Sequence, residues 1–299
     1  MKNILIVEDS DVVVKVLRHL MSQSHDYQPV HTTSFAQVKA LLDHTNNPNS
    51  ATSTSETQIF GALVDCQLSD APNGEILDYL LSKKIPTILF AGADDLENCE
   101  QYFQKGIADY VMKEGRHAYK NAINIITRLE KNQGIKVMVV DESEKSRAHI
   151  VKLLSRHLFQ VVEAKDGMDA IKILLDNPDI KLLFTDHDMR RMDDFELIRN
   201  LRHKYDQTEL VIIGITSSDS RCSSAQYIKH GANDFLVKPF QPEEFYYRVN
   251  HNIELLESNE RVAHASQRDH LTGLFHRQYF FNAARDVYTQ SEEKSSPLA

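Results

Sequence analysis

Acidic residues, a threonine and a lysine in the second half of the chain could together handle a phosphoryl group. Asp141 and Glu142 form an acidic pair, a lone aspartate follows at Asp186, and Thr216 and Lys238 come after it. Three carboxylates at one place repel by about 4 kcal/mol per pair at ~4 Å, so they need a cation. An oxygen-only ligand set with open positions favours Mg²⁺, beside which the lone aspartate could act as a nucleophile.

The first half of the chain carries an echo of this pattern. Glu8 and Asp9 precede a lone Asp65 by a longer interval than in the second copy, and Lys113 lies further on. The interval between the threonine and the lysine of the second copy, counted back from Lys113, reaches Ala91. The first copy therefore keeps the carboxylates and the lysine but lacks the hydroxyl that would donate a hydrogen bond to a phosphoryl oxygen.

Short apolar runs that alternate with segments of helical period must position these residues. In the second copy the predicted strands are Val137–Val140, Gln160–Ala164, Leu182–Thr185, Leu210–Ile215 and Phe235–Val237, with helices over Ser146–Leu158 and Met168–Leu175 between them. The alternation predicts a doubly wound, five-stranded parallel sheet with helices on both faces. Because every reactive residue lies at the end of a predicted strand, all of them should meet at the carboxyl edge of the sheet.

The repeat predicts two α/β domains, over residues 1–131 and 135–248. A Ser/Thr/Asn-rich stretch over 44–58 is interpreted as a loop inserted in the first domain, which explains its longer interval to Asp65. The last helix should begin near Pro242 and continue through Ser266, so that residues 249–267 form a helical connector. Its seven-residue apolar spacing is weak, and it fits either a homodimer contact or a single solvated helix.

Composition excludes several classes. A formal net charge of −9 argues against a nucleic-acid-binding surface, and no apolar run is long enough to span a membrane. Three widely spaced cysteines (Cys66, Cys99 and Cys222) fit reduced thiols in a cytoplasmic protein.

Over roughly Lys136–Leu255, these residues and intervals resemble the response-regulator receiver domain of two-component signalling. The resemblance implies a flavodoxin-like fold and a sensor histidine kinase or phosphotransfer protein as partner. It also implies that Asp186 accepts the phosphoryl group. Mg²⁺ would be held by Asp141, Glu142, Asp186 and the backbone of Met189.

The same resemblance gives roles to three further residues. Thr216 and Lys238 would contact the phosphoryl group, Phe235 would be the aromatic switch, and the Lys-Pro peptide bond would be cis. The chain departs from the family at Arg190 and Asp194, where Pro and Gly are frequent, and at Glu142, where Asp is commoner.

Carried over to the first copy, the resemblance describes a degenerate receiver. Glu8, Asp9 and Asp65 would form a second Mg²⁺ site with Asp65 as a second acceptor. Lys113 and Tyr110 take the lysine and aromatic positions.

After the connector, residues 268–280 read RDHLTGLFHRQYF, which resembles the DxLTGLxNR opening of the GGDEF diguanylate cyclase domain. Residues 268–299 are therefore expected to be the start of that domain. The printed sequence contains neither the later metal-binding Asp nor the GG(D/E)EF signature, so this stretch is not expected to make cyclic di-GMP from GTP. An intact parent protein would be the cyclase.

The sequence thus predicts a phosphorylation-controlled input module of a diguanylate cyclase. An alternative is a non-catalytic receiver adaptor or phosphate sink, favoured by the degenerate first copy. A phosphatase that forms an aspartyl phosphate uses similar carboxylates, but the threonine and Lys-Pro spacing disfavours it.

Overall fold

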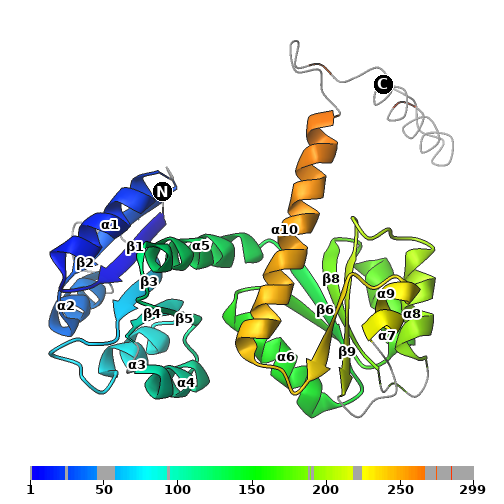
Figure 1. The fold of residues 1–299 in the computed structure, drawn as a ribbon, viewed down its shortest axis with the longest axis horizontal. Helices are drawn as coiled ribbons and strands as arrows, with labels where there is room; N and C mark the ends of the chain where they lie inside the picture. Colours follow the sequence, from blue (N-terminus) through cyan, green and yellow to red (C-terminus); the bar gives the residue numbers. More distant parts are fainter. Residues whose placement is uncertain are drawn as a thin grey trace. The chain divides into compact units, whose positions relative to one another are not determined.

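The computed structural model of the chain describes residues 2–23, 26–45, 58–92, 95–187, 189, 192–217 and 224–266, with the single residues 274 and 284. They form two compact units, each with one five-stranded sheet (Figure 1). The first unit contains residues 1–135 and 149–161, and the second contains residues 136–148 and those from 162 onward. The stretch 46–57, within the expected inserted loop, and most of the expected cyclase start lie outside the described residues.

The first unit alternates strands with helices along the chain. Its strands are β1 (Lys2–Val7), β2 (Tyr27–Thr32), β3 (Ile59–Asp65), β4 (Thr87–Ala91) and β5 (Asp109–Met112). Its helices are α1 (Asp11–Ser22), α2 (Phe35–Thr45), α3 (Glu75–Ser82), α4 (Leu96–Lys105) and α5 (Arg116–Asn132). The strands pair in parallel in the order β2-β1-β3-β4-β5. Each helix between two strands therefore returns the chain to the amino edge of the sheet, and all the strands end at the opposite edge.

The second unit repeats this order. Its strands are β6 (Lys136–Val140), β7 (Gln160–Ala164), β8 (Ile180–Asp186), β9 (Val211–Ser217) and β10 (Asp234–Lys238). Its helices are α6 (Glu144–Arg156), α7 (Gly167–Asp176), α8 (Asp194–Arg202), α9 (Ser224–His230) and α10 (Pro242–Ser266). The sheet order is β10-β9-β8-β6-β7. The predicted fold class, two doubly wound five-stranded parallel sheets, is confirmed, and the predicted strands of the second copy coincide closely with the observed ones.

The central strands of both sheets are buried by apolar side chains. Strands β1, β4 and β9 are buried almost throughout, because helices cover both faces of a parallel sheet. The core of the first unit packs α1 and α5 side chains such as Leu17 and Ile126 on Ile4 and Leu63. A core cluster of the second unit packs side chains of α7, α8 and α9 on its strands, with Tyr227 fully buried. This packing fixes the strand ends on which the reactive residues stand.

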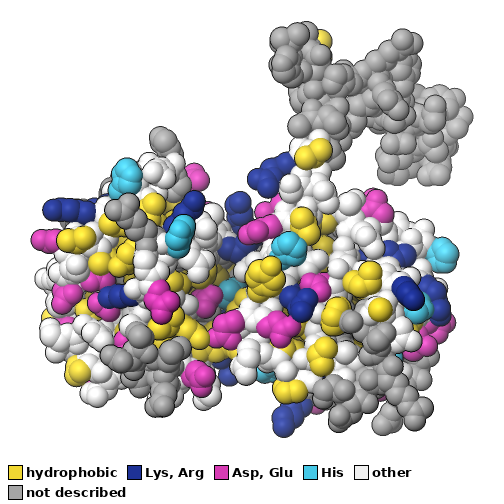
Figure 2. Space-filling model, viewed as in Figure 1, with side chains coloured by type: hydrophobic (Ala, Val, Ile, Leu, Met, Phe, Trp, Pro, Cys, Tyr) yellow, Lys and Arg dark blue, Asp and Glu magenta, His cyan; other side chains and the backbone are white. Residues whose placement is uncertain are grey.

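The helix α10 runs 25 residues from Pro242 to Ser266, as the sequence predicts. The part of α10 up to Leu256 is buried against the second sheet through apolar side chains, namely Phe245, Val249, Ile253 and Leu256. Other apolar side chains of the same helix are exposed (yellow in Figure 2). In the part of the chain that the structure describes, no helix is long and apolar enough to cross a membrane.

Candidate functional site

The carboxyl edge of the second sheet brings Asp141, Asp186 and Lys238 into contact. Asp141 follows β6, Asp186 ends the neighbouring β8, and Lys238 ends β10 on the far side of β9. The Lys238 Nζ lies 2.6 Å from Asp186 Oδ1 and 3.3 Å from Asp141 Oδ2. It also donates to Ser146 Oγ at 2.8 Å. One ammonium group therefore compensates two carboxylates that stand on different strands.

Asp141 is held rigidly at this edge. Its side chain is buried, and Oδ1 accepts a hydrogen bond from the backbone N–H of Ser143 at 2.8 Å. The guanidinium of Arg147 donates to the Asp141 backbone carbonyl at 2.8 Å. Glu142, the next residue, is half-buried at the start of the same loop. Serine at position 146 escapes sequence reasoning, although its place in the first turn of the helix after an acidic pair would have indicated it.

Thr216 and Phe235 occupy neighbouring strands beside this cluster. Thr216 is buried on β9, and its Oγ1 donates to the Ser217 carbonyl over a long 3.4 Å. Phe235 is half-buried on β10 and packs against the core. The guanidinium of Arg248, on α10, lies 5.4 Å from the centre of the Phe235 ring and donates to Asp234 Oδ1 at 2.7 Å. The expected switch aromatic is thus in contact with the connector helix.

Two of the three departures from the expected pattern, Arg190 and Asp194, follow Asp186 in the chain. Met189 is buried and its backbone N–H donates to the His187 carbonyl at 3.0 Å, while Arg190 lies outside the described residues. Asp194 is completely buried, and its Oδ1 accepts a hydrogen bond from His187 Nδ1 at 3.0 Å. Burial raises the pKa of Asp194, against the opposing effect of its polar neighbours. The sequence flags Asp194 as unusual but does not reveal this His187 contact.

The peptide bond between Lys238 and Pro239 is cis, as the resemblance implies. It lies directly after β10, at the carboxyl edge of the second sheet.

The first unit gathers the predicted acidic residues of its own copy. Carboxylate oxygens of Glu8, Asp9 and Asp65 lie within 4.8 Å of one another, a spacing that one metal ion could bridge. Lys113, directly after β5, places Nζ 2.7 Å from Asp65 Oδ2 and 3.4 Å from Glu8 Oε2. The half-buried Tyr110 stands on the same strand. The copy predicted to be degenerate therefore has a compact carboxylate set.

In the first site the ionised form of a buried carboxylate, Glu8, is costly. Burial raises the pKa of Glu8, and the nearby Asp65 charge raises it further, against the smaller effect of Lys113. Burial lowers the pKa of Lys113, but its hydrogen bond and ion pair with Asp65 outweigh this, and the net shift is upward. Lys113 therefore stays charged, and the carboxylates beside it favour an additional cation.

The end of β4, beside Ala91, carries a hydrogen-bond network centred on Asp95. Ala91 is fully buried, and the next residue, Gly92, donates its N–H to Asp95 Oδ2 at 2.9 Å. Gln67, two residues past Asp65, reaches the same Asp95 oxygen at 3.4 Å through its side-chain amide. Sequence reasoning missed this network, because Asp95 belongs to no motif.

The thiols of Cys66 and Cys99, near this site, have raised pKa values. Cys66 and Cys99 are free thiols. Burial, followed by the charge of Asp95, raises the pKa of Cys66 to about 12 and that of Cys99 to about 11. Both thiols are protonated at neutral pH, which makes them poor nucleophiles. Cys222 lies outside the described residues.

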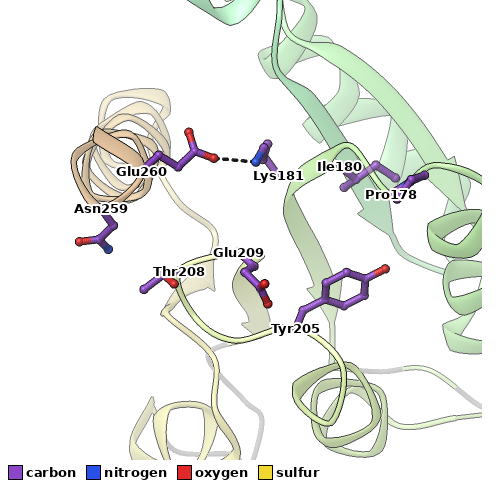
Figure 3. Close-up of a pocket in the computed structure, with 8 residues that line it drawn as sticks. All are labelled: Pro178, Ile180, Lys181, Tyr205, Thr208, Glu209, Asn259 and Glu260. Carbon is purple, nitrogen blue, oxygen red and sulfur yellow. Dashed lines mark hydrogen bonds and ion pairs between the residues drawn. The ribbon is translucent and has the colours of Figure 1, made fainter. Parts of the chain in front are cut away.

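A separate hollow of about 380 Å³ opens at the amino edge of the second sheet (Figure 3). It is lined by Pro178, Ile180, Lys181, Tyr205, Thr208, Glu209, Asn259 and Glu260. Lys181, at the start of β8, forms an ion pair with Glu260 of α10 at 2.6 Å. Both side chains are 40% exposed, so the pair contributes only about 0–1 kcal/mol. The hollow lies at the opposite ends of the strands from the reactive residues and marks where α10 leaves the sheet.

Comparison with known families matches residues 137–250 to the response regulator receiver domain. A chemotaxis protein CheY homolog of Campylobacter jejuni is 34% identical over 110 residues, which make up 36% of this chain and 85% of that protein. Chemotaxis protein CheY1 of Helicobacter pylori is 36% identical over 110 residues and is covered to 89% of its length.

Solved structures extend the likeness to both units. One crystal structure, of a protein described as a two-component system response regulator/GGDEF domain protein, is 36% identical with a TM-score of 0.75. The match covers 86% of this chain and all of that one. A second structure with a similar description is 37% identical with a TM-score of 0.74 over the same shares.

Proposed function

The chain belongs to the response regulator receiver family, and on that premise we propose that Asp186 is its phosphoryl acceptor. A carboxylate oxygen of Asp186 would attack the phosphorus of a phosphohistidine or a small acyl phosphate. The bond from phosphorus to the donor's leaving atom would break, and the phosphoryl group would remain on Asp186 as an acyl phosphate. The donor in the cell would be a sensor histidine kinase or a phosphotransfer protein.

The observation that carries this proposal is the contact of Lys238 Nζ with Asp186 Oδ1 at 2.6 Å. A lysine at this distance can follow the negative charge from the carboxylate to a phosphoryl oxygen, because its ammonium needs to move little. Thr216 stands on the strand between them and can turn its hydroxyl, now in a long bond to a backbone carbonyl, toward a phosphoryl oxygen. These side chains supply positioning and charge, which is most of what phosphoryl transfer requires.

The acidic residues of both units offer the oxygen ligands that Mg²⁺ prefers. In the second unit Asp141, Glu142, Asp186 and the Met189 backbone would hold it, and in the first unit Glu8, Asp9 and Asp65 would do so. The donor atoms are all oxygens, and in the first unit they lie within 4.8 Å of one another. Bound Mg²⁺ would neutralise the carboxylates and orient a phosphoryl oxygen.

We further propose that the first unit, over residues 1–131, is a second receiver with Asp65 as acceptor. Its support is the repeated geometry, in which Lys113 contacts Asp65 as Lys238 contacts Asp186. Ala91 has no hydroxyl, so the residue at the switch position of the first unit could not donate a hydrogen bond to a phosphoryl group on Asp65. Thr216 would donate such a bond in the second unit. This departure favours a secondary role, as a phosphate sink or adaptor, for the first unit.

The output would be a diguanylate cyclase joined through α10, residues 249–267 acting as connector and 268–299 as the cyclase start. Support comes from the LTGLF sequence (271–275) and from the two similar proteins described as response regulator/GGDEF proteins. Exposed apolar side chains on α10, which include Tyr247, Leu255 and Val262, give this helix a surface for pairing two copies. A homodimer would bring two cyclase domains together.

The test is phosphorylation of the purified chain by acetyl phosphate with Mg²⁺, with the modified residue located by mass spectrometry. The expected result is a phosphoryl group on Asp186, with any second one on Asp65, and no modification of Asp186 when a chelator removes Mg²⁺ before acetyl phosphate is added. Absence of modification on Asp186 in a folded, Mg²⁺-supplied protein would reject the proposal. Production of cyclic di-GMP by the product of the complete gene separates the cyclase from the adaptor.

A further inference from the structure

The helix α6 is shared between the two compact units. Residues 149–161, its C-terminal half and the residues that follow, belong to the first unit, although β6, which precedes them, lies in the second sheet. Residues 136–148 belong to the second unit. The helix is continuous over 13 residues, about 20 Å, from Glu144 to Arg156. Its two ends therefore belong to different units.

The C-terminal end of α6 places a buried histidine inside the first unit. The His157 Nε2 lies 3.2 Å from the Ala108 carbonyl and 3.9 Å from Asp109 Oδ2, at the start of β5. The side-chain amide of Asn132, on α5, donates to the His157 carbonyl at 3.0 Å. His157 is 1% exposed, and burial lowers its pKa to about 3, so the imidazole is neutral and donates from Nε2.

Neighbouring residues secure the same segment by directional contacts. Arg156 stacks its guanidinium 4.5 Å from the ring centre of Phe103 and donates to the Gln104 carbonyl at 3.5 Å. Arg128 orients Asn132 by a hydrogen bond of 2.8 Å from its Nε. The segment 149–161 thus contacts the end of α4, the start of β5 and the end of α5. The contacts of His157 and Asn132 are buried, where a lost hydrogen bond is costly, so a shift of β5 would be felt at the end of α6.

The strand β5 connects this packing to the first carboxylate site. It is four residues long, about 13 Å, from Asp109 near His157 to Met112. Lys113 follows at once and forms the ion pair with Asp65. A change of charge at Asp65 would move Lys113, and with it a short strand whose other end touches α6. This route does not need the hydroxyl that Ala91 lacks.

The N-terminal end of α6 contacts the second site. Ser146 Oγ accepts a hydrogen bond from Lys238 Nζ at 2.8 Å, while Lys238 also bonds Asp186. Arg147 donates to the backbone carbonyl of Asp141 at 2.8 Å. The first turn of α6 therefore contacts both Lys238 and Asp141, which belong to the same site as Asp186.

We propose that α6 couples the Asp65 site to the Asp186 site, with Lys113, β5 and His157 at one end and Ser146 and Lys238 at the other. The state of the first site would set the position of α6 and thereby the reactivity of Asp186. Coupling of this kind is reciprocal, so the state of Asp186 would also be felt at β5. The kinetic part of the inference rests on the proposed function of Asp186, and the structural part does not.

Hydrogen exchange of the full chain tests the structural part without any phosphoryl donor. Lys113→Ala disturbs the first site directly. The expected result is an exchange rate at the amides of both 149–161 and 143–147 that changes by about fivefold or more. In an Arg156→Ala, His157→Gln background, Lys113→Ala should no longer affect residues 143–147. Lys152→Ala, on the exposed side of α6, is the matched control and should leave exchange in both segments as in the parent.

Phosphorylation rates test the kinetic part in the same variants. Asp65→Asn should change the rate of acetyl phosphate transfer to Asp186 by about fivefold or more, and Arg156→Ala should reduce that effect to within about twofold. If the Arg156→Ala, His157→Gln double variant does not fold, Arg156→Ala alone replaces it as the background. Exchange at 143–147 that ignores Lys113→Ala, while amides around Asp65 respond, would overturn the coupling. Failure of Asp186 to take a phosphoryl group would reject the proposed function instead, and the exchange result would still decide the coupling.

Discussion

Lys238 Nζ lies 2.6 Å from Asp186 Oδ1, so the last strand of the second sheet places a cation directly on the lone aspartate of β8. The first unit repeats this contact between Lys113 and Asp65 at 2.7 Å. Each lysine also contacts an acidic residue that follows the first strand of its own sheet. Lys238 contacts Asp141, and Lys113 contacts Glu8. A phosphoryl group or a metal ion at either site would therefore share its charges with a lysine already in place.

Replacing Lys238 by methionine keeps most of the side-chain volume and removes the cation. Because the ammonium would stabilise charge on the transferring group, the rate of Asp186 phosphorylation by acetyl phosphate should fall about 100-fold. Lys181→Met, on the opposite edge of the same sheet, is the control and should leave that rate close to the parent's. An unchanged rate in Lys238→Met would show that the contact has no part in the transfer.

Exchanging the residues at the switch position should separate phosphorylation from its consequence. Thr216→Ala gives the second unit the residue that Ala91 provides in the first. Asp186 should still be phosphorylated, but the change in hydrogen exchange over β10 and α10 on addition of BeF₃⁻ and Mg²⁺ should be lost. Thr208→Ala, an exposed threonine, should keep that change. A full response in Thr216→Ala would contradict the role given to its hydroxyl.

Glu8 is expected to oppose stability while serving metal binding. Burial and the Asp65 charge raise its pKa, so the ionised carboxylate is costly in the folded protein. Glu8→Gln should raise the melting temperature in the absence of Mg²⁺ by a few degrees, corresponding to about 1 kcal/mol. A second comparison uses an Asp141→Asn background, which blocks Mg²⁺ binding at the second site. In that background Mg²⁺ should raise the melting temperature, and Glu8→Gln should remove most of this increase. Calorimetry with and without Mg²⁺ measures both effects, and a destabilised Glu8→Gln protein would refute the argument.

His157 should make the first unit sensitive to acid. Its pKa is lowered to about 3 in the folded protein and would be about 6.5 in the unfolded chain, so unfolding takes up a proton between these values. The stabilising contribution is complete above about pH 6.5 and is lost as the pH falls toward 3, with a slope of about 1.4 kcal/mol per pH unit. The free energy of unfolding, measured with denaturant from pH 7 to pH 4, should depend less steeply on pH in His157→Gln than in the parent. The exposed His203→Gln should keep the parent's slope, and equal slopes in all three proteins would contradict the assignment.

Much of the fold could be predicted because the strands are short apolar runs with helical periods between them. Lys238 and Asp186 lie far apart in the sequence, and their contact follows from parallel strands that end at one edge. The first-unit carboxylates follow from the same rule. Resemblance to a known family supplied the roles, which residue types alone leave open between several phosphoryl-transfer chemistries.

What the sequence could not reveal depends on packing between distant segments. Asp95 accepts a hydrogen bond from the nearby Gly92 and another from Gln67, which follows the neighbouring strand β3. His157 lies at the end of an ordinary amphipathic helix, and nothing in its neighbours predicts burial against β5 of the first unit. The predicted limits of the domains, at residues 131 and 135, stay predictions, and the pattern contains no sign that residues 149–161 pack with the first unit.

The most direct test of the central claim is phosphorylation of Asp186→Asn and Asp65→Asn proteins by acetyl phosphate in Mg²⁺. Intact-mass and peptide analysis would give the amount and the position of the phosphoryl group. Asp65→Asn should retain modification of Asp186, and Asp186→Asn should lose it while any remaining modification maps to Asp65. Modification of Asp186→Asn at the parent's rate and extent, with none on Asp186 in the Asp65→Asn protein, would contradict the account.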